Sequence, residues 1–209
     1  MKSPFKLLVV LALMLAVFSQ HTAASAGDIS KFSGRSAQAF FFTQQDECVG
    51  TFVGLFANEG KFQNPPGSPG QGRFADAFID RFNFCTGESV FFAFGSKALD
   101  ASEFSIDRGL NSASLTTSME MFAFTPGGEF TFIADIDMNW TGIGQLVRES
   151  FSFKSQTPKC KFMTSSRGSF RSAEASGVIS DGSENFTPGS TQDAFLTQTR
   201  SGTWVVGCN

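Results

Sequence analysis

The stretch EFTFIADIDMNW, from Glu129 to Trp140, alternates apolar and polar residues along almost its whole length. Its even-numbered positions are all apolar, and only Ile133 breaks the polar run of its odd-numbered positions. In a β-strand successive side chains point to opposite faces, so a period of two indicates one buried and one wet face. This stretch therefore predicts a half-buried β-strand.

The residues before this strand complete a β-hairpin. Residues 112–124 alternate as well, with apolar side chains at the odd-numbered positions 113, 115, 119 and 121, and TPGG at 125–128 is a turn-forming sequence. In a register that places Met121 opposite Phe132, the apolar faces of both strands coincide. A shift of one residue would set buried positions against wet ones, so the two patterns predict one register.

Similar patterns recur through the rest of the chain. An earlier hairpin is predicted from residues 51–57 and 73–84, joined by an irregular loop. Residues 98–104 are predicted to hold one short helical turn. Further strands are predicted at residues 35–43, 89–95, 145–154, 169–180, 192–199 and 203–207, the last two joined by a turn at 200–202. About ten strands with Gly, Ser and Asn turns predict an all-β, single-domain antiparallel β-sandwich or barrel.

The first residues have the features of a secretory signal peptide. Two lysines precede an apolar stretch over residues 7–18, which is too short to cross a bilayer comfortably. An Ala-x-Ala sequence ending at Ala26 then fits a signal peptidase site. We expect residues 1–26 to be a signal peptide cleaved near Ala26, and residues 27–209 to form one secreted, periplasmic or extracellular β domain. The mature chain contains no stretch that predicts a transmembrane segment.

Four cysteines follow the predicted cleavage point, and an even number in an exported chain predicts disulfides. They are Cys48, Cys85, Cys160 and Cys208. Four cysteines allow three pairings, but the earlier hairpin places Cys48 opposite Cys85. We therefore predict the bond Cys48–Cys85, which leaves Cys160 to pair with Cys208. No CxxC pair is present to suggest a zinc or redox site.

The distribution of histidine and the aromatic residues limits the chemistry. The only histidine, His21, lies in the predicted signal peptide. The mature chain therefore lacks the side chain that nucleophilic triads and most zinc and copper sites require. We predict no cofactor, no metal and no catalytic residue, and favour a protein that is not an enzyme. Tyrosine is absent while phenylalanine numbers 27, so the aromatic residues are suited to packing rather than to hydrogen bonding.

The net charge argues against nucleic acid as a partner. The whole chain has a formal net charge of −3. Without the two lysines of the predicted signal peptide it has 14 Lys and Arg against 19 Asp and Glu, a net charge of −5. Proteins that bind nucleic acid through its phosphates need a basic surface. We instead expect an extracellular partner or glycan.

Four residues are candidates for contact with a ligand. Asp76 and Asp80 share one strand face among phenylalanines, where carboxyl groups can acquire raised pKa values and act as acids. Trp140 and Trp204 are the only tryptophans, and either could stack on a sugar ring if it were exposed. Both tryptophans fall on apolar strand faces, which favours positions in the core.

Three functions are consistent with these features. The leading hypothesis is a non-catalytic secreted β domain with a binding, adhesive or structural role. The second is a polysaccharide hydrolase that uses only carboxylates, with Asp76 and Asp80 as its acids. The third is a barrel that encloses a small apolar ligand.

Two segments resemble parts of exported β-rich bacterial proteins that have no assigned function. These are WTGIG at residues 140–144 and FRSAEASG at residues 170–177. The resemblance implies a bacterial secreted protein and carries no activity or site residue with it. In a eukaryotic secretory pathway, Asn139 and Asn185 would each lie in an acceptor sequence for N-glycosylation.

Overall fold

The computed structural model describes residues 29–63, 70–158, 160–189 and 192–206. Almost all of these residues lie in ten β-strands, and the described part of the chain contains no helix. The strands are β1 (Ile29–Gln44), β2 (Val49–Gln63), β3 (Gly70–Asn83), β4 (Glu88–Ala98), β5 (Phe104–Ile106), β6 (Ser112–Thr125), β7 (Gly128–Thr157), β8 (Cys160–Ser180), β9 (Asn185–Phe186) and β10 (Gln192–Val206). The predicted all-β class and the predicted number of strands are confirmed.

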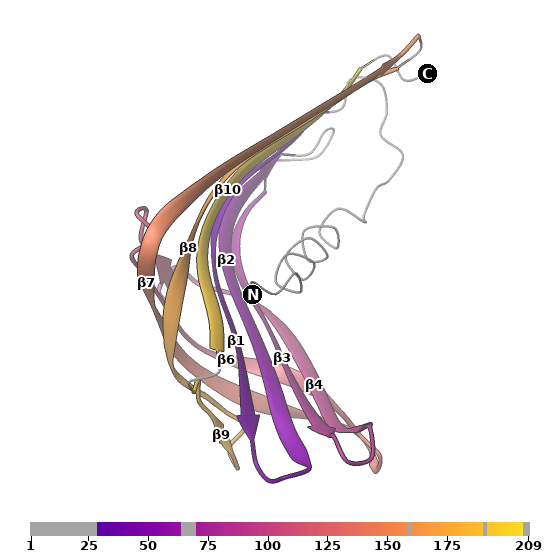
Figure 1. Ribbon diagram of the computed structural model, residues 1–209, viewed down its shortest axis with the longest axis vertical. Helices are drawn as coiled ribbons and strands as arrows, with labels where there is room; N and C mark the ends of the chain where they lie inside the picture. Colours follow the sequence, from indigo (N-terminus) through magenta and orange to yellow (C-terminus); the bar gives the residue numbers. More distant parts are fainter. Residues whose placement is uncertain (1–28, 64–69, 159, 190–191, 207–209) are drawn as a thin grey trace.

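All ten strands belong to one antiparallel sheet (Figure 1). Its order is β10-β1-β2-β3-β4-β6-β7-β8-β9, and β5 pairs with β6. Because β10 also pairs with β8, the sheet closes on itself as a barrel. The closure is partial, since β4 and β6 pair only at Phe92–Phe94 against Phe122–Phe124.

The β6–β7 hairpin has the register that the alternation predicts. Met121 lies opposite Phe132, and Ala113 lies opposite Trp140. The odd-numbered side chains of β6 from Ala113 to Ala123 and the even-numbered side chains of β7 from Ala134 to Trp140 are buried. The hydrophobic pattern and the TPGG turn therefore fix this pairing together.

Several strands extend beyond their predicted ends. The structure has one strand, β10, where residues 192–199 and 203–207 are predicted as two. Residues 200–202 do not turn, because they pair on one side with β1 and on the other with β8. The ladders on both sides outweigh the local turn preference of Ser and Gly. Residues 98–104 form a hydrogen-bonded turn before β5, not a helical turn.

β7 likewise joins two predicted strands, residues 129–140 and 145–154, into one. The pairing with β8 shifts between Ile143 and Val147, where a bulge takes up the extra residues. The sequence pattern breaks at this bulge, and the sequence therefore predicts two separate strands. A bulge bends a strand without ending it, so β7 continues to Thr157.

The interior of the barrel is filled by side chains. Small residues such as Ala37, Ala57 and Ala75 lie side by side on β1–β3 and leave room for larger side chains from the opposite wall. Trp140 is 1% exposed, and its indole Nε1–H donates to the backbone oxygen of Gln38 at 3.0 Å. This bond joins β7 to β1, so the two walls of the barrel are in contact.

Beyond the barrel the sheet continues as an open extension, which we call the arm (Figure 1). The arm bends away from the barrel, and its β7 segment is largely exposed while its β8 segment is mostly half-buried. Cross-strand pairing continues through it, so each side chain of the arm can be assigned to one of two faces. The arm consists of residues 29–35, 59–63, 70–73, 146–157, 160–171 and 198–206.

Candidate binding surface

The outer face of the barrel carries a group of phenylalanines on β1–β4 and the end of β6. Their even residue numbers place them opposite the buried odd-numbered side chains of the same strands. We call this group the Phe surface. Its members are Phe40, Phe42, Phe52, Phe56, Phe78, Phe82, Phe92, Phe94, Phe122 and Phe124.

Cross-strand pairing brings these rings together in rows. One row runs from Phe78 on β3 to Phe94 on β4 and Phe122 on β6. The ring centroids of Phe94 and Phe122 are 6.0 Å apart, and those of Phe94 and Phe124 are 6.1 Å apart. Phe40 and Phe52 extend the contacts to β1 and β2 at 6.3 Å. The rings thus form two contacting groups, one on β1–β3 and one on β4 and β6, which the pairing of Phe78 with Phe94 places side by side on one face. Phe42 and Phe82 both contact the ring of Phe84 beside them.

A glycine beneath a ring lets that ring lie against the sheet. A Cβ atom added at Gly54 would come within 2.1 Å of the ring of Phe78, its partner on β3. Gly50 is covered in the same way by the ring of Phe42. Rings laid over glycines give the surface broad aromatic faces rather than upright edges.

Much of this aromatic area is open to solvent. Phe94 is 46% exposed and Phe122 is 49% exposed, and Phe52, Phe92 and Phe124 are also exposed. Single exposed apolar residues are ordinary, but a contiguous apolar patch indicates an interaction site. Phe94 contacts three other rings and lies near the middle of the exposed part.

Asp76 and Asp80 lie on this same outer face of β3. Asp80 is placed between Phe52 and Phe92 and accepts a hydrogen bond from Ser89 Oγ at 2.8 Å. Asp76 is half-buried between Phe56 and Ser96, and no hydrogen bond or ion pair to it occurs among the described residues. The Phe surface therefore combines aromatic rings with two carboxylate acceptors.

The spacing of the two aspartates does not suit hydrolysis by paired carboxylates. They are four residues apart on a strand, about 13 Å at the backbone, with Phe78 between them. The carboxyl groups of glycosidases lie about 5–10 Å apart on either side of the scissile bond.

The two tryptophans occupy different environments. Trp140 lies in the core, where it can contact no ligand from solvent. Trp204 is half-buried on the arm, with its ring across Gly202. The sequence favoured the core for both residues, and Trp204 departs from that expectation because β10 leaves the barrel before reaching it.

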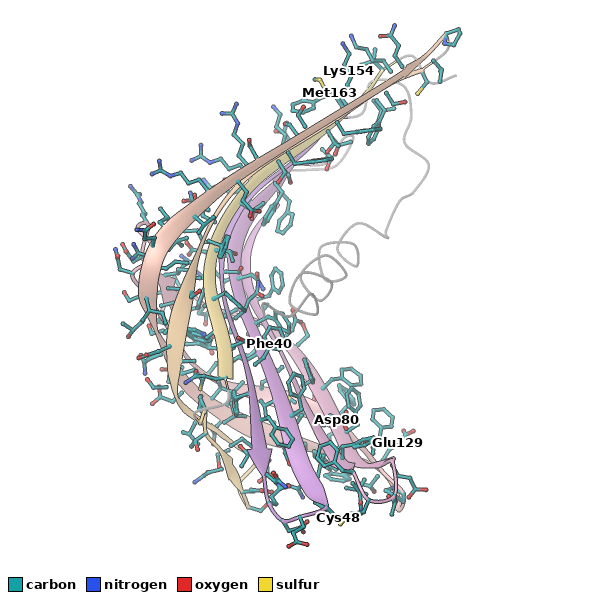
Figure 2. All side chains as sticks on the ribbon, viewed as in Figure 1. Phe40, Cys48, Asp80, Glu129, Lys154 and Met163 are labelled. Carbon is teal, nitrogen blue, oxygen red and sulfur yellow. A yellow bond between two sulfur atoms is a disulfide. The ribbon has the colours of Figure 1, made fainter. Side chains whose placement is uncertain are left out.

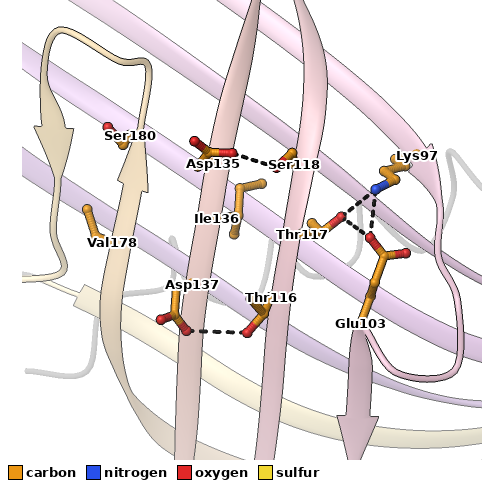
Figure 3. Close-up of a pocket in the computed structure, with 10 residues that line it drawn as sticks. All are labelled: Lys97, Glu103, Thr116, Thr117, Ser118, Asp135, Ile136, Asp137, Val178 and Ser180. Carbon is orange, nitrogen blue, oxygen red and sulfur yellow. Dashed lines mark hydrogen bonds and ion pairs between the residues drawn. The ribbon is translucent and has the colours of Figure 1, made fainter.

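A shallow pocket of about 520 Å³ lies on another wall, over β6, β7 and the end of β8 (Figure 3). Asp135 accepts a hydrogen bond from Ser118 Oγ at 2.5 Å, and Lys97 Nζ donates to Glu103 at 2.6 Å. Lys97 also donates to Thr117 at 2.8 Å. These polar groups pair with one another, and the described residues contain no cluster of three metal-binding side chains.

Glu103 makes the stability of this region depend on pH. Hydrogen bonds from Lys97 and then from Thr117 lower its pKa from 4.5 to about 2. The folded state therefore gains stability above pH 4.5 and loses it as the pH falls toward 2. Because the pair is partly open to solvent, we expect this contribution to be at most about 1 kcal/mol. The urea denaturation curves of wild type and Glu103→Gln should converge as the pH falls to about 2, whereas the exposed control Glu120→Gln should follow wild type throughout.

The disulfide Cys48–Cys85 is present, as the hairpin predicts. It links the chain at the start of β2 to the chain after β3, with the two Cα atoms 5.2 Å apart. Cys160 is also disulfide-bonded, while its predicted partner Cys208 lies outside the described residues. Bonds of this kind persist in oxidising compartments, which fits an exported protein. The predicted signal peptide also lies outside the described residues.

Comparisons with family models, curated proteins and solved structures give no match to this chain. In the described residues no helix is long and apolar enough to cross a membrane. The resemblance to exported bacterial proteins stays a prediction.

Proposed function

We propose that this chain is a non-catalytic exported binding domain that holds a glycan on its Phe surface. The observation that carries the proposal is the set of neighbouring aromatic rings on one outer face of β1–β4 and β6, five of which are exposed to solvent. A soluble domain exposes such a patch where a partner covers it. The rings at its centre offer the apolar contact on which tight binding depends.

The two aspartates favour a glycan over a purely apolar partner. An apolar partner would cover Asp76 and Asp80 without replacing the water that solvates their carboxylates, which is unfavourable. A glycan offers hydroxyl groups that can donate to these oxygens, while the apolar faces of its sugar rings rest on phenylalanine. The free carboxylate of Asp76 and the second oxygen of Asp80 supply the acceptors.

The other two hypotheses gain less support from the same geometry. The distance between Asp76 and Asp80 exceeds that of a glycosidase pair. The core side chains, with Trp140 among them, occupy the barrel interior that a small apolar ligand would need.

Affinity electrophoresis through gels containing soluble xylan, mannan or hydroxyethylcellulose tests this proposal. We expect the mature protein to be retarded by at least one of these neutral polysaccharides. Phe94→Ser should weaken that retardation at least tenfold, because Phe94 contacts three other rings of the surface. Asp76→Asn should weaken it less, since an amide still accepts one hydrogen bond.

Phe151→Ser is the matched control, because Phe151 is 60% exposed but lies on the arm, away from the Phe surface. Equal retardation of Phe94→Ser and Phe151→Ser would contradict the proposal. So would the absence of retardation across a broad set of neutral polysaccharides.

A further inference from the structure

One face of the arm carries most of the cationic side chains of the chain. Cross-strand pairing assigns each side chain to one face of the arm, since directly paired residues point to the same face. This face continues the side that is buried inside the barrel. We call it the basic face, and its Lys and Arg residues are Lys31, Arg35, Lys61, Arg73, Arg148, Lys154, Lys161, Arg167, Arg171 and Arg200. They are ten of the 14 Lys and Arg that follow the predicted signal peptide.

Figure 2 shows this arrangement, with side chains that end in nitrogen along the convex side of the arm and Lys154 near its far end. The opposite face of the arm carries Phe, Thr, Ser and Gly instead, among them Phe151, Phe162 and Thr199. The two faces of one sheet therefore differ sharply in charge.

Three of the ten cations are neutralised or hydrogen-bonded where the arm meets the barrel. Arg35 and Arg73 both form ion pairs with Glu59, the only acid on the described part of the basic face. Arg171 donates to Asn111 at 2.5 Å. These contacts anchor the base of the arm.

The other seven cations are exposed, and the described residues provide no ion pair for any of them. They are Lys31, Lys61, Arg148, Lys154, Lys161, Arg167 and Arg200. Arg167 and Arg200 lie directly opposite each other on β8 and β10. Like charges in that position repel and destabilise a sheet. The repulsion is relieved when an anion binds across the pair.

We infer that the basic face binds an anionic polysaccharide. Its seven exposed cations are spread over β7, β8, β10, β1 and β2, about 20 Å across the strands. That width suits several charged groups of one extended polymer better than a single small anion. The net charge of the mature chain is negative in spite of this face, because most of the Asp and Glu residues lie on the barrel.

The polar residues between the cations favour a polysaccharide over nucleic acid. Ser150, Ser152 and Ser165 lie on the same face, and their hydroxyl groups can hydrogen-bond sugar hydroxyls. Single-stranded nucleic acid is bound by several aromatic side chains on which its bases stack. On the described part of the basic face Trp204 is the only aromatic residue, so it offers one stacking position for a sugar ring.

The inference can be tested by the binding of labelled heparin and polygalacturonate to the mature protein, with dextran as the neutral control. We expect both anionic polymers to bind through the basic face, whereas Arg200→Ser should leave any binding of neutral dextran by the Phe surface unchanged. Binding should weaken steeply with added salt, since each cation that contacts the polymer displaces a condensed counterion. Arg200→Ser should weaken heparin binding about three- to tenfold and lower the salt slope by about one, while Arg167→Ser/Arg200→Ser should weaken it further.

Arg108→Ser is the matched control, because Arg108 is exposed on a turn of the barrel and its loss changes the net charge equally. The melting temperature of Arg200→Ser should equal or exceed that of wild type, which separates lost binding from lost folding. Equal losses of heparin binding in Arg108→Ser and Arg200→Ser would overturn the inference.

Two further probes decide the class of partner. Tighter binding of single-stranded DNA than of either polysaccharide would overturn the assignment to a polysaccharide, as would binding only to phosphatidylglycerol vesicles. Phe94→Ser should leave heparin binding unchanged, because Phe94 lies on the barrel. This inference therefore stands or falls separately from glycan binding by the Phe surface.

Discussion

Replacement of Trp140 by alanine should lower the free energy of unfolding by about 3–5 kcal/mol. Trp140 is the largest fully buried side chain of the barrel, and its indole N–H donates across the interior to the carbonyl oxygen of Gln38. The substitution removes apolar contact from both walls and leaves that carbonyl without its partner. Since whole domains are stable by about 5–15 kcal/mol, a large share of the folding free energy should be lost. Equilibrium denaturation in urea measures it.

Two variants separate the causes of this loss. Trp140→Phe should recover most of the packing but not the hydrogen bond, and we expect a loss of about 1–3 kcal/mol. Trp204→Ala removes the same side chain from a half-buried position on the arm and should cost less than about 1.5 kcal/mol. If Trp140→Ala and Trp204→Ala were equally stable, Trp140 would not hold the two walls of the barrel together.

The sequence predicted the β6–β7 hairpin in full, because both patterns needed for it are local. Each strand has a clean period of two, and the turn between them is short. The earlier hairpin and the bond Cys48–Cys85 also followed from adjacent strand patterns, although a longer irregular loop was predicted between those strands. The pairing and register of two strands that follow each other in the chain can be inferred from their residues alone.

The continuous strands β7 and β10 could not be predicted in this way. In β10 the turn-like residues 200–202 are held straight by pairing with β1 and β8, which are not adjacent to them in the sequence. The sequence also could not assign the rings of Phe40-Phe41-Phe42 to their sides. Phe41 is 1% exposed in the core, while its two neighbours lie on the Phe surface.

The basic face shows most clearly what composition conceals. A net charge of −5 argued against nucleic acid as a partner, yet it says nothing of how charges are arranged in space. Arg167 and Arg200 are far apart in the chain, and only the pairing of β8 with β10 brings them together. A charged surface built from five strands becomes visible only when the registers are known.

Removal of the disulfide should be the other large perturbation of stability. The bond Cys48–Cys85 joins residues 37 apart in the chain. In the chain-entropy model, closing a loop of this size restricts the unfolded chain by about 4 kcal/mol. We therefore expect Cys48→Ser/Cys85→Ser to lower the free energy of unfolding by about 3–4 kcal/mol, measured by urea denaturation without reductant.

The folded state itself should change little in this double variant. A backbone hydrogen bond of 2.7 Å from Phe84 N to the oxygen of Cys48 holds the same end of the hairpin, next to the paired residues Val49 and Asn83. Retardation by a neutral polysaccharide should therefore match that of wild type at low temperature, because the rings of the Phe surface keep their backbone. A loss of less than about 1 kcal/mol would mean that the unfolded chain already keeps residues 48 and 85 close together without the bond.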